Sequence, residues 1–329
     1  MANFKDIIGH EQIIRHLKKA IDNHKVSHAY IFNGDKGTGK AILAGAFAKA
    51  LQCESYDGDS CGVCRSCLQT ESGNQPDIKW ITHDKPATIS VDDIRTQVNY
   101  DIAIKPYSSP YKIYIIPDAQ KMTPQAQNAL LKTIEEPPEY AILLLLTSDV
   151  NILLPTILSR CVKLNIKAVD TDIITKYLIK NYQIPDYKAK ILASFSQGNV
   201  GKAVKMAISV DFQEMYDEIL RLLKHIDSME INEIVDAIKK MEVYKMDIDD
   251  VIDMMMLWYR DVMILAATND PNLIVFKEEY SILNKRVAKS SFNGLDNIIK
   301  GMERAKKRLA ANVNFDLTME LMLLTIKEN

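Results

Sequence analysis

The segment Gly34-Asp35-Lys36-Gly37-Thr38-Gly39-Lys40 has the residue types and spacing of a loop that binds phosphate. It follows the apolar run 29–32 and precedes a helical pattern at 42–51. Glycines let successive backbone N–H groups turn toward one anion, and a helix N-terminus adds positive potential. The Lys40 ammonium would reach the β- and γ-phosphates. The pattern therefore predicts that ATP or ADP binds through Gly34, Gly37, Thr38, Gly39 and Lys40.

Two positions that nucleotide cleavage needs carry alanine. The residue after the lysine is normally Ser or Thr, whose hydroxyl binds Mg²⁺, and here it is Ala41. Asp118 follows the apolar run 112–116 and could hold Mg²⁺ through water, but the residue after it, a glutamate base in many ATPases, is Ala119. We expect weak nucleotide binding without hydrolysis. The alternative is a phosphate loop kept only for its shape.

Four cysteines lie within fifteen residues, in the spacing C-x7-C-x2-C-x2-C. In a reducing compartment this density favours a metal site over disulfides. Four thiolates form a closed tetrahedral Zn²⁺ site with no position for water, which makes such a site structural. The predicted ligands are Cys53, Cys61, Cys64 and Cys67, and the alternative is a set of free loop thiols. Cys161, alone in an apolar run, is interpreted as a core residue.

These residues need a scaffold, and the first half of the chain predicts one. Short apolar runs alternate with helical periodicity, which is typical of a parallel sheet with helices on both faces. A capped helix is expected from Pro124 to Glu136, between Thr123 and Pro137, with Glu135 and Glu136 as solvated charges at its end. The expected strands are 29–32, 78–81, 112–116, 141–147 and 161–164, and further helices are expected at 13–20, 42–51 and 91–102.

After Asn165 the strand pattern stops and the rest of the chain is expected to be helical. Helices are predicted at 171–182 and 186–197, with Gly198 as a stop signal and a third helix ending near 207. The Met-rich and aromatic segment 251–265 is expected to be a buried helix of an oligomerisation bundle. The predicted domains are therefore 1–165, 166–207 and 208–329.

Composition limits the functions that the chain can have. Lys and Arg number 41 and Asp and Glu 43, a formal net charge of -2, so a DNA binder driven by its own charge is disfavoured. The longest apolar run, 140–146, is far shorter than the roughly 20 residues of a membrane span. The start MANFKDIIGH has no apolar signal core. We expect a cytoplasmic protein that does not bind membranes.

Five segments together resemble the AAA+ clamp-loader family of DNA polymerase III, over nearly the whole chain. They are FKDIIGHEQIIRHLKKAI, SHAYIFNGDKGTGK, YKIYIIPDAQKMTPQAQNALLKTIEEPPEYAILLLLT, LLPTILSRC and ANVNFDLTMELMLL, and the SRC tripeptide is the most specific part. The resemblance implies a nucleotide-fold module, a small helical lid and an all-α collar that closes a five-subunit ring. It implies a role in DNA replication, with gamma/tau and delta subunits, the sliding clamp and primer-template DNA as partners. No polymerase or independent ATPase activity is expected of the isolated chain.

The resemblance also implies roles for individual residues. Arg160, in the SRC tripeptide, would be an arginine finger that reaches the ATP of a neighbouring subunit. The alternative for Arg160 is an ion pair within the chain. Ser148 aligns with a first sensor of the γ-phosphate, but the second sensor, usually arginine, is Gly201 here, with Lys202 one residue along. The chain would thus lend a catalytic arginine while its own site has lost residues.

Two competing functions remain open at this point. A gamma/tau-type ATPase would hydrolyse ATP at its own phosphate loop, which Ala41 and Ala119 disfavour. A zinc-dependent nucleic-acid module would read DNA through the cysteine segment, which the balanced charge disfavours. Contact with DNA inside a ring would fall to basic residues of the first half such as Arg95, Lys105 and Lys112, whose alternative is simple solvation.

Overall fold

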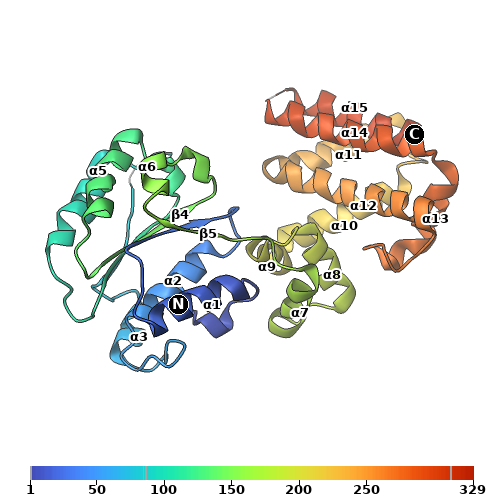
Figure 1. Ribbon diagram of the computed structural model, residues 1–329. Helices are drawn as coiled ribbons and strands as arrows, with labels where there is room; N and C mark the ends of the chain where they lie inside the picture. The colour runs from blue at the N-terminus through green and yellow to red at the C-terminus, as the bar shows by residue number, and fades with distance from the viewer. Residues whose placement is uncertain (1, 84, 86, 312) are drawn as a thin grey trace. The chain divides into compact units, whose positions relative to one another are not determined.

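The computed structural model describes residues 2–83, 85, 87–311 and 313–329, and it divides into two compact units (Figure 1). The first unit comprises Met1–Ile173 with Gly198–Gly201, and the second comprises Ile174–Gln197 with Lys202–Asn329. The predicted division of the second half at residue 208 is not resolved by these two units and stays a prediction. Asn312, in the C-terminal motif, lies outside the described residues.

The first unit contains the predicted parallel sheet, which confirms the fold class. Its described strands have the order β2-β3-β4-β1-β5, and every neighbouring pair is parallel. Tyr30 of β1 lies opposite Leu144 of β4 and Val162 of β5, which places β1 inside the sheet. The strand bounds are β1 Ala29–Asn33, β2 Ile78–Trp80, β3 Lys112–Ile116, β4 Ala141–Thr147 and β5 Val162–Asn165.

Two apolar clusters cover the two faces of this sheet. Successive residues of β1 alternate between them, with Ala29 and Ile31 in one cluster and Tyr30 and Phe32 in the other. Side chains of a strand point to opposite faces in turn, and a strand buried on both sides therefore has a continuous apolar run. This explains why β4 is apolar through Ile142–Leu146 and buried throughout.

Helices of the first unit pack on these two faces. α2 begins at the phosphate loop, α5 begins after the Thr123 cap, and Thr123 Oγ1 accepts a hydrogen bond from the Ala126 N–H at 3.2 Å. The bounds are α1 Glu11–Asp22, α2 Lys40–Leu51, α3 Arg65–Glu71, α4 Val91–Ile94, α5 Pro124–Glu135 and α6 Pro155–Leu158.

The helix expected at 91–102 differs from the structure. α4 ends at Ile94, a π-helical turn spans Arg95–Asn99, and a 3-10 turn spans Asp101–Ala103. Ile94, Val98 and Ile102 are all buried, at a spacing of four residues. In a regular α-helix, residues spaced by four drift around the helix axis, because one turn has 3.6 residues. The wider π-helical turn keeps these three residues on one face. The Tyr100 N–H accordingly donates to the Arg95 carbonyl at 2.9 Å.

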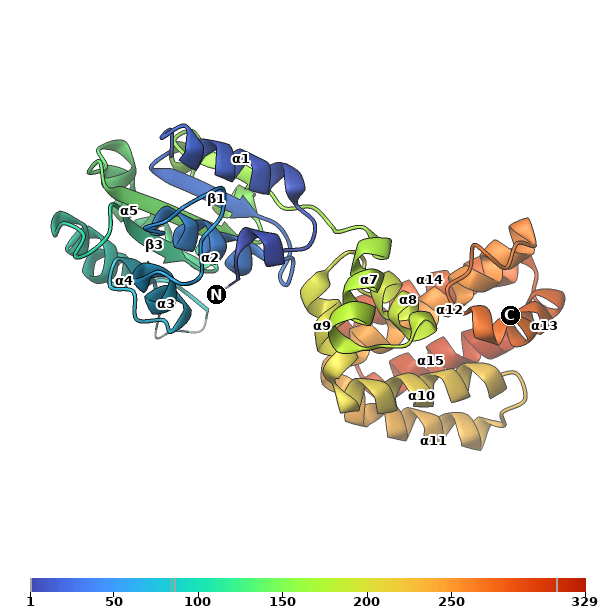
Figure 2. The ribbon, with the colours of Figure 1, turned by 90° about the horizontal axis from the view of Figure 1, so that it is seen from below.

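The regular secondary structure of the second unit consists of helices alone among the described residues, as expected (Figure 2). α12 buries Met254, Met255, Trp258 and Tyr259, so the Met-rich segment is a buried helix. Its role in oligomerisation stays a prediction. From the end of the first unit onward the bounds are α7 Thr171–Tyr182, α8 Asp186–Phe195, α9 Val200–Ile208, α10 Val210–His225, α11 Ile231–Met241, α12 Ile248–Thr268, α13 Tyr280–Lys289, α14 Phe292–Ala310 and α15 Phe315–Glu328.

Candidate functional site

The phosphate loop connects β1 to α2, as the sequence predicts. Gly37 and Gly39 have φ angles of 89° and 93°, a conformation that side chains disfavour, so glycine is required at both positions. The Lys40 ammonium donates to the carbonyl oxygens of Gly34 at 2.5 Å and Asp35 at 2.7 Å. Thr38 Oγ1 also donates to the Asp35 carbonyl, at 2.7 Å. The loop thus brings all five predicted nucleotide-binding residues together and satisfies its lysine internally.

Charge around Lys40 favours its role as a phosphate ligand. Burial lowers the pKa of Lys40, and the carboxylates of Asp118 and Asp35 partly offset this effect. The two carboxylates therefore stabilise the ammonium form, which is the form that attracts phosphate. The N-terminus of α2, capped by Gly39 without a side-chain hydrogen bond, leaves backbone N–H groups directed at the loop.

A turn at Gly198–Gly201, which belongs to the first unit, contacts this loop. The Asn199 side-chain amide donates to the Lys36 carbonyl at 2.6 Å, and the Gly201 N–H donates to the Gly37 carbonyl at 3.1 Å. A Cβ atom on Gly201 would approach the Gly37 carbonyl to 2.8 Å. Gly201, at the position that the resemblance assigns to a second sensor, therefore lies with its backbone against the phosphate loop. Lys202, next in sequence, instead pairs with Asp250 at 2.7 Å.

Asp118 and Ser148 follow neighbouring strands of the sheet and are joined through one glutamine. Gln120 Nε2 donates to Asp118 Oδ1 at 3.4 Å, and Gln120 Oε1 accepts the Ser148 N–H at 3.2 Å. Asp118 also pairs with Lys121 at 3.1 Å. Burial opposes ionisation of Asp118, but Lys121, Gln120 and Lys36 together outweigh it and lower the pKa of Asp118. Sequence reasoning missed Gln120, because only the fold shows that β3 and β4 end side by side.

The residue after Asp118 cannot act on water. Ala119 has no exposed surface and belongs to the apolar cluster on one face of the sheet. Ala41, by contrast, is exposed at the start of α2. The two alanines therefore differ in kind. At position 41 a hydroxyl side chain would fit, because the site is exposed. At position 119 a carboxylate would be buried in apolar surroundings.

Arg160 lies just after the short helix α6 and is exposed over 41% of its side chain. Its Nη2 atom pairs with Glu135 Oε1 at 3.1 Å, and its Nη1 atom donates to the Thr156 carbonyl at 3.1 Å and to Ser159 Oγ at 3.2 Å. Glu135 is exposed at the end of α5, as interpreted from the sequence, but it is also paired with Arg160, because the fold places the end of α5 beside α6. The ion pair within the chain, which the sequence left as an alternative, is present.

The four predicted metal ligands come together in one cluster. The Sγ atoms of Cys53, Cys61, Cys64 and Cys67 all lie within 4.8 Å of one another. Backbone N–H groups point at three of these sulfurs, with donors Cys61, Cys64 and Cys67 at 3.3–3.4 Å. Such N–H···S contacts neutralise thiolate charge in a four-sulfur metal site. The donor set and spacing thus fit one tetrahedral cation and leave no open position.

The thiols of this cluster titrate differently. Backbone N–H groups of Val63 and Cys64 lower the pKa of Cys61 to about 6, so this thiolate forms readily. Burial raises the pKa of Cys53 and Cys67. A bound divalent cation deprotonates such thiols by its own charge. Cys161, whose pKa burial raises to about 12, packs against an apolar cluster as expected of a core residue.

The cysteine segment is fastened to the phosphate-loop helix and to the N-terminal segment. Lys49 of α2 has no exposed surface, and its ammonium binds Glu71 at 2.5 Å and Asn3 Oδ1 at 2.8 Å. Asp59, between the first two cysteines, accepts the N–H groups of Phe4 at 3.1 Å and Lys5 at 3.0 Å. The cysteine cluster therefore lies in a structural junction and not in the phosphate-binding loop.

The basic residues considered for DNA contact divide into two groups. Arg95 and Lys105 are exposed. Lys112 is buried, pairs with Asp101 at 3.0 Å and donates to the carbonyls of Asp101 and Ile104. Lys112 is therefore a structural cation of the first unit, and it is unsuited to DNA contact.

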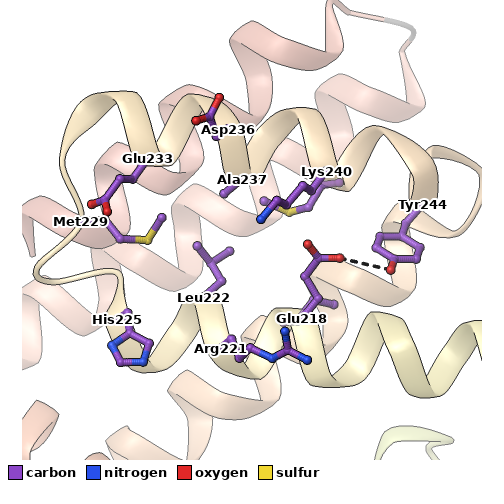
Figure 3. Close-up of a pocket in the computed structure, with 12 residues that line it drawn as sticks. Glu218, Arg221, Leu222, His225, Met229, Glu233, Asp236, Ala237, Lys240 and Tyr244 are labelled. Carbon is purple, nitrogen blue, oxygen red and sulfur yellow. Dashed lines mark hydrogen bonds between the residues drawn. The ribbon is translucent and has the colours of Figure 1, made fainter.

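A cavity of about 390 Å³ lies between α10 and α11 in the second unit (Figure 3). Leu222, Met229 and Ala237 provide apolar lining, and Glu218 accepts a hydrogen bond from the Tyr244 hydroxyl at 3.2 Å. The ionised side chains around it are of both signs: Glu218, Glu233 and Asp236 against Arg221 and Lys240. This balance does not suit a phosphate group, and none of the predicted site residues lines the cavity.

This chain is similar to known proteins over nearly its whole length. A family model described as "DNA polymerase III, delta subunit" matches residues 9–170. The DNA polymerase III subunit delta′ of Bacillus subtilis is 30% identical over 321 residues, which is 96% of each protein. The tau/gamma subunit of Haemophilus influenzae is 35% identical over 209 residues, 62% of this chain but only 30% of that protein.

Among solved structures, a DNA polymerase III gamma subunit-related protein of Thermotoga maritima covers 97% of this chain and 98% of its own, at 19% identity and a TM-score of 0.43. No helix of the described residues is both long and apolar enough to span a membrane.

The match to delta′ over 96% of the chain, together with the parallel sheet, the phosphate loop and the exposed arginine of the SRC tripeptide, leads to one assignment. The chain belongs to the AAA+ clamp-loader family, among the relatives of bacterial DNA polymerase III delta′ subunits.

Proposed function

We propose that this chain is the delta′-type subunit of a DNA polymerase III clamp loader, which activates a neighbouring ATPase and does not hydrolyse ATP itself. The observation that carries the proposal is the full-length match to a delta′ subunit, at 30% identity over 96% of the chain. The relatives named tau and gamma match only part of their own length. This difference favours the delta′ role over a gamma/tau-type motor.

The phosphate loop of this chain is proposed to bind ATP or ADP weakly. Gly34, Gly37, Thr38, Gly39 and Lys40 supply the cradle, with Asp118 and Ser148 at the adjoining strand ends. Ala41 offers no hydroxyl for Mg²⁺, and buried Ala119 offers no base. Binding of a nucleotide here would stabilise the first unit without turnover.

Arg160 is proposed to act in trans. Its guanidinium is exposed, always charged and able to bind the oxygens of a transferring phosphoryl group. When the arginine comes from another subunit, hydrolysis depends on assembly. The ATP concerned would be bound by an adjacent gamma/tau subunit, and the collar helices of the second unit would hold the two subunits together.

The cysteine cluster is proposed to bind one structural Zn²⁺. Four sulfur donors within 4.8 Å of one another favour this ion over Mg²⁺ and Ca²⁺, which prefer oxygen ligands. The junction with α2 and the N-terminal segment gives the ion a folding role. The competing function, a zinc-dependent reader of nucleic acid, predicts binding that disappears on chelation and weakens steeply with salt.

The remaining partners follow from the assembly. We propose that the chain works with gamma/tau and delta subunits in the cytoplasm and that the complete ring places the sliding clamp on primer-template DNA. Arg95 and Lys105 are the exposed first-unit candidates for DNA contact. Net charge near neutrality agrees with DNA contact that depends on the ring.

The decisive experiment replaces Arg160 in a reconstituted complex with the cognate gamma/tau and delta subunits. Turnover at the adjacent ATP site is expected to fall at least about 10³-fold in Arg160→Ala, with assembly by size-exclusion chromatography unchanged. Arg15→Ala, an exposed arginine on α1, is the matched control. Unchanged DNA-stimulated ATP turnover in Arg160→Ala would contradict the proposal.

A further inference from the structure

We infer that Glu135 is a positioning residue for Arg160 and sets the direction in which the guanidinium is presented to the neighbouring ATP. This inference rests on the proposed role of Arg160 in trans. Glu135 Oε1 lies 3.1 Å from Arg160 Nη2, and no other carboxylate of the described residues pairs with that arginine.

Glu135 is held on rigid backbone. It is the last residue of α5, a helix capped at its start by Thr123 and stopped at its end by Pro137-Pro138. Ala126, Leu130 and Ile134 bury the apolar side of α5 in a core cluster. The core of the first unit therefore fixes the backbone from which the Glu135 side chain extends.

The segment that carries Arg160 is fastened to the same helix. Gln127, near the start of α5, accepts the Leu154 N–H at 2.8 Å and donates to the Ile152 carbonyl at 3.3 Å. α6 follows directly and packs against α5, as Figure 1 shows. The chain from 152 to 160 is thus tied to α5 before α6 through Gln127 and after α6 through Glu135.

The contacts hold one side of the guanidinium and leave another side available. Nη1 is used by the Thr156 carbonyl and Ser159 Oγ, and Nη2 by Glu135. Nε has no acceptor among the described residues. A guanidinium has five N–H donors in a fixed plane, so orienting Nη1 and Nη2 also orients the remaining donors.

The pair is too exposed to be kept for stability. The side chains of Arg160 and Glu135 are 41% and 46% exposed, and ion pairs at this exposure contribute little to folding. An exposed arginine without such a partner samples many rotamers, and catalysis depends steeply on the placement of a reacting charge. Orientation is therefore the effect that Glu135 can supply.

The test uses the reconstituted complex and takes the loss of ATP turnover in Arg160→Ala as its reference. Glu135→Ala is expected to reduce turnover at the site next to Arg160 about tenfold, a smaller loss than the reference of at least about 10³-fold, with the KM for ATP unchanged. Glu135→Gln keeps an acceptor oxygen and is expected to retain more turnover than Glu135→Ala. Glu136→Ala is the matched control, since Glu136 is exposed and its side chain has no partner among the described residues.

The outcomes separate this inference from the proposed function. In the Arg160→Ala background, Glu135→Ala is expected to cause no further loss, because there is no guanidinium left to orient. Full or increased turnover in Glu135→Ala, with a clear loss in Arg160→Ala, would overturn the inference and leave the finger intact. Full turnover in Arg160→Ala would overturn both. A loss in Glu135→Ala that comes with failed assembly or a lowered melting temperature would identify a structural role and also overturn it.

Discussion

Replacing Ala119 by glutamate restores the residue type of an active ATPase and is nevertheless expected to destabilise the first unit strongly. Ala119 has no exposed surface and lies in an apolar cluster, next to the negative charge of Asp118. If the new carboxyl stays protonated with a pKa near 7, its shift from about 4.3 costs about 3.7 kcal/mol. Overpacking adds roughly 1–3 kcal/mol. Ala119→Glu should therefore lose about 5–7 kcal/mol, which is comparable with the whole stability of many domains.

Urea unfolding followed by peptide-resolved hydrogen exchange of β3 and β4 would measure this loss in the first unit alone. The raised pKa means that the folded form binds the extra proton more tightly, so the penalty should grow as pH rises above about 4.3. Ala41→Thr, at an exposed position, should change stability by less than about 0.5 kcal/mol. Two results would refute the reasoning. One is a loss of unfolding free energy below about 1 kcal/mol in Ala119→Glu, and the other is ATP turnover near about 1 s⁻¹ in the variant that combines Ala119→Glu with Ala41→Thr.

Two further variants test the cysteine cluster and the buried ion pair of Asp101 with Lys112. Cys64→Ser should lower the zinc content, measured by elemental analysis, from one ion per chain toward zero, whereas Cys161→Ser should leave it unchanged; equal metal content in both variants would exclude the cysteine cluster as the site. Burial opposes ionisation of Asp101, but Lys112, Lys79 and Tyr114 outweigh it and keep its pKa below the usual value. Its stabilising charge is thus present above about pH 4 and lost at lower pH, so Asp101→Asn should cost about 2–3 kcal/mol at pH 7 and less at pH 3 in urea titrations. An equal cost at both pH values would show that the ion pair is not the cause.

Local pattern was enough to predict the sheet and the phosphate loop. The strands at 112–116 and 141–147 coincide with β3 and β4, because a strand buried on both faces is continuously apolar. The glycines and Lys40 lie together because they are neighbours in sequence. The four cysteines form a cluster for the same reason, since they lie within fifteen residues of one another in the sequence.

Pairs that only the tertiary fold creates could not be predicted. Glu135 and Arg160 are 25 residues apart, and their ion pair depends on α6 packing on α5. Lys112 looks like a strand-start charge in sequence, but the turn at 101–104 covers it and supplies its acceptors. The π-helical turn at Arg95–Asn99 likewise follows from the need to bury three residues at a spacing of four, which a helical periodicity alone conceals.

The amine of Lys49 has a practical consequence for following this protein in solution. A lysine with no exposed surface, enclosed by Glu71 and Asn3, is inaccessible to reagents that acylate amines. Its labelling requires that the N-terminal segment or the cysteine loop first separate from α2. Acylation footprinting of this one side chain would therefore report the opening of that junction, in the free chain or within a larger complex, without any engineered probe.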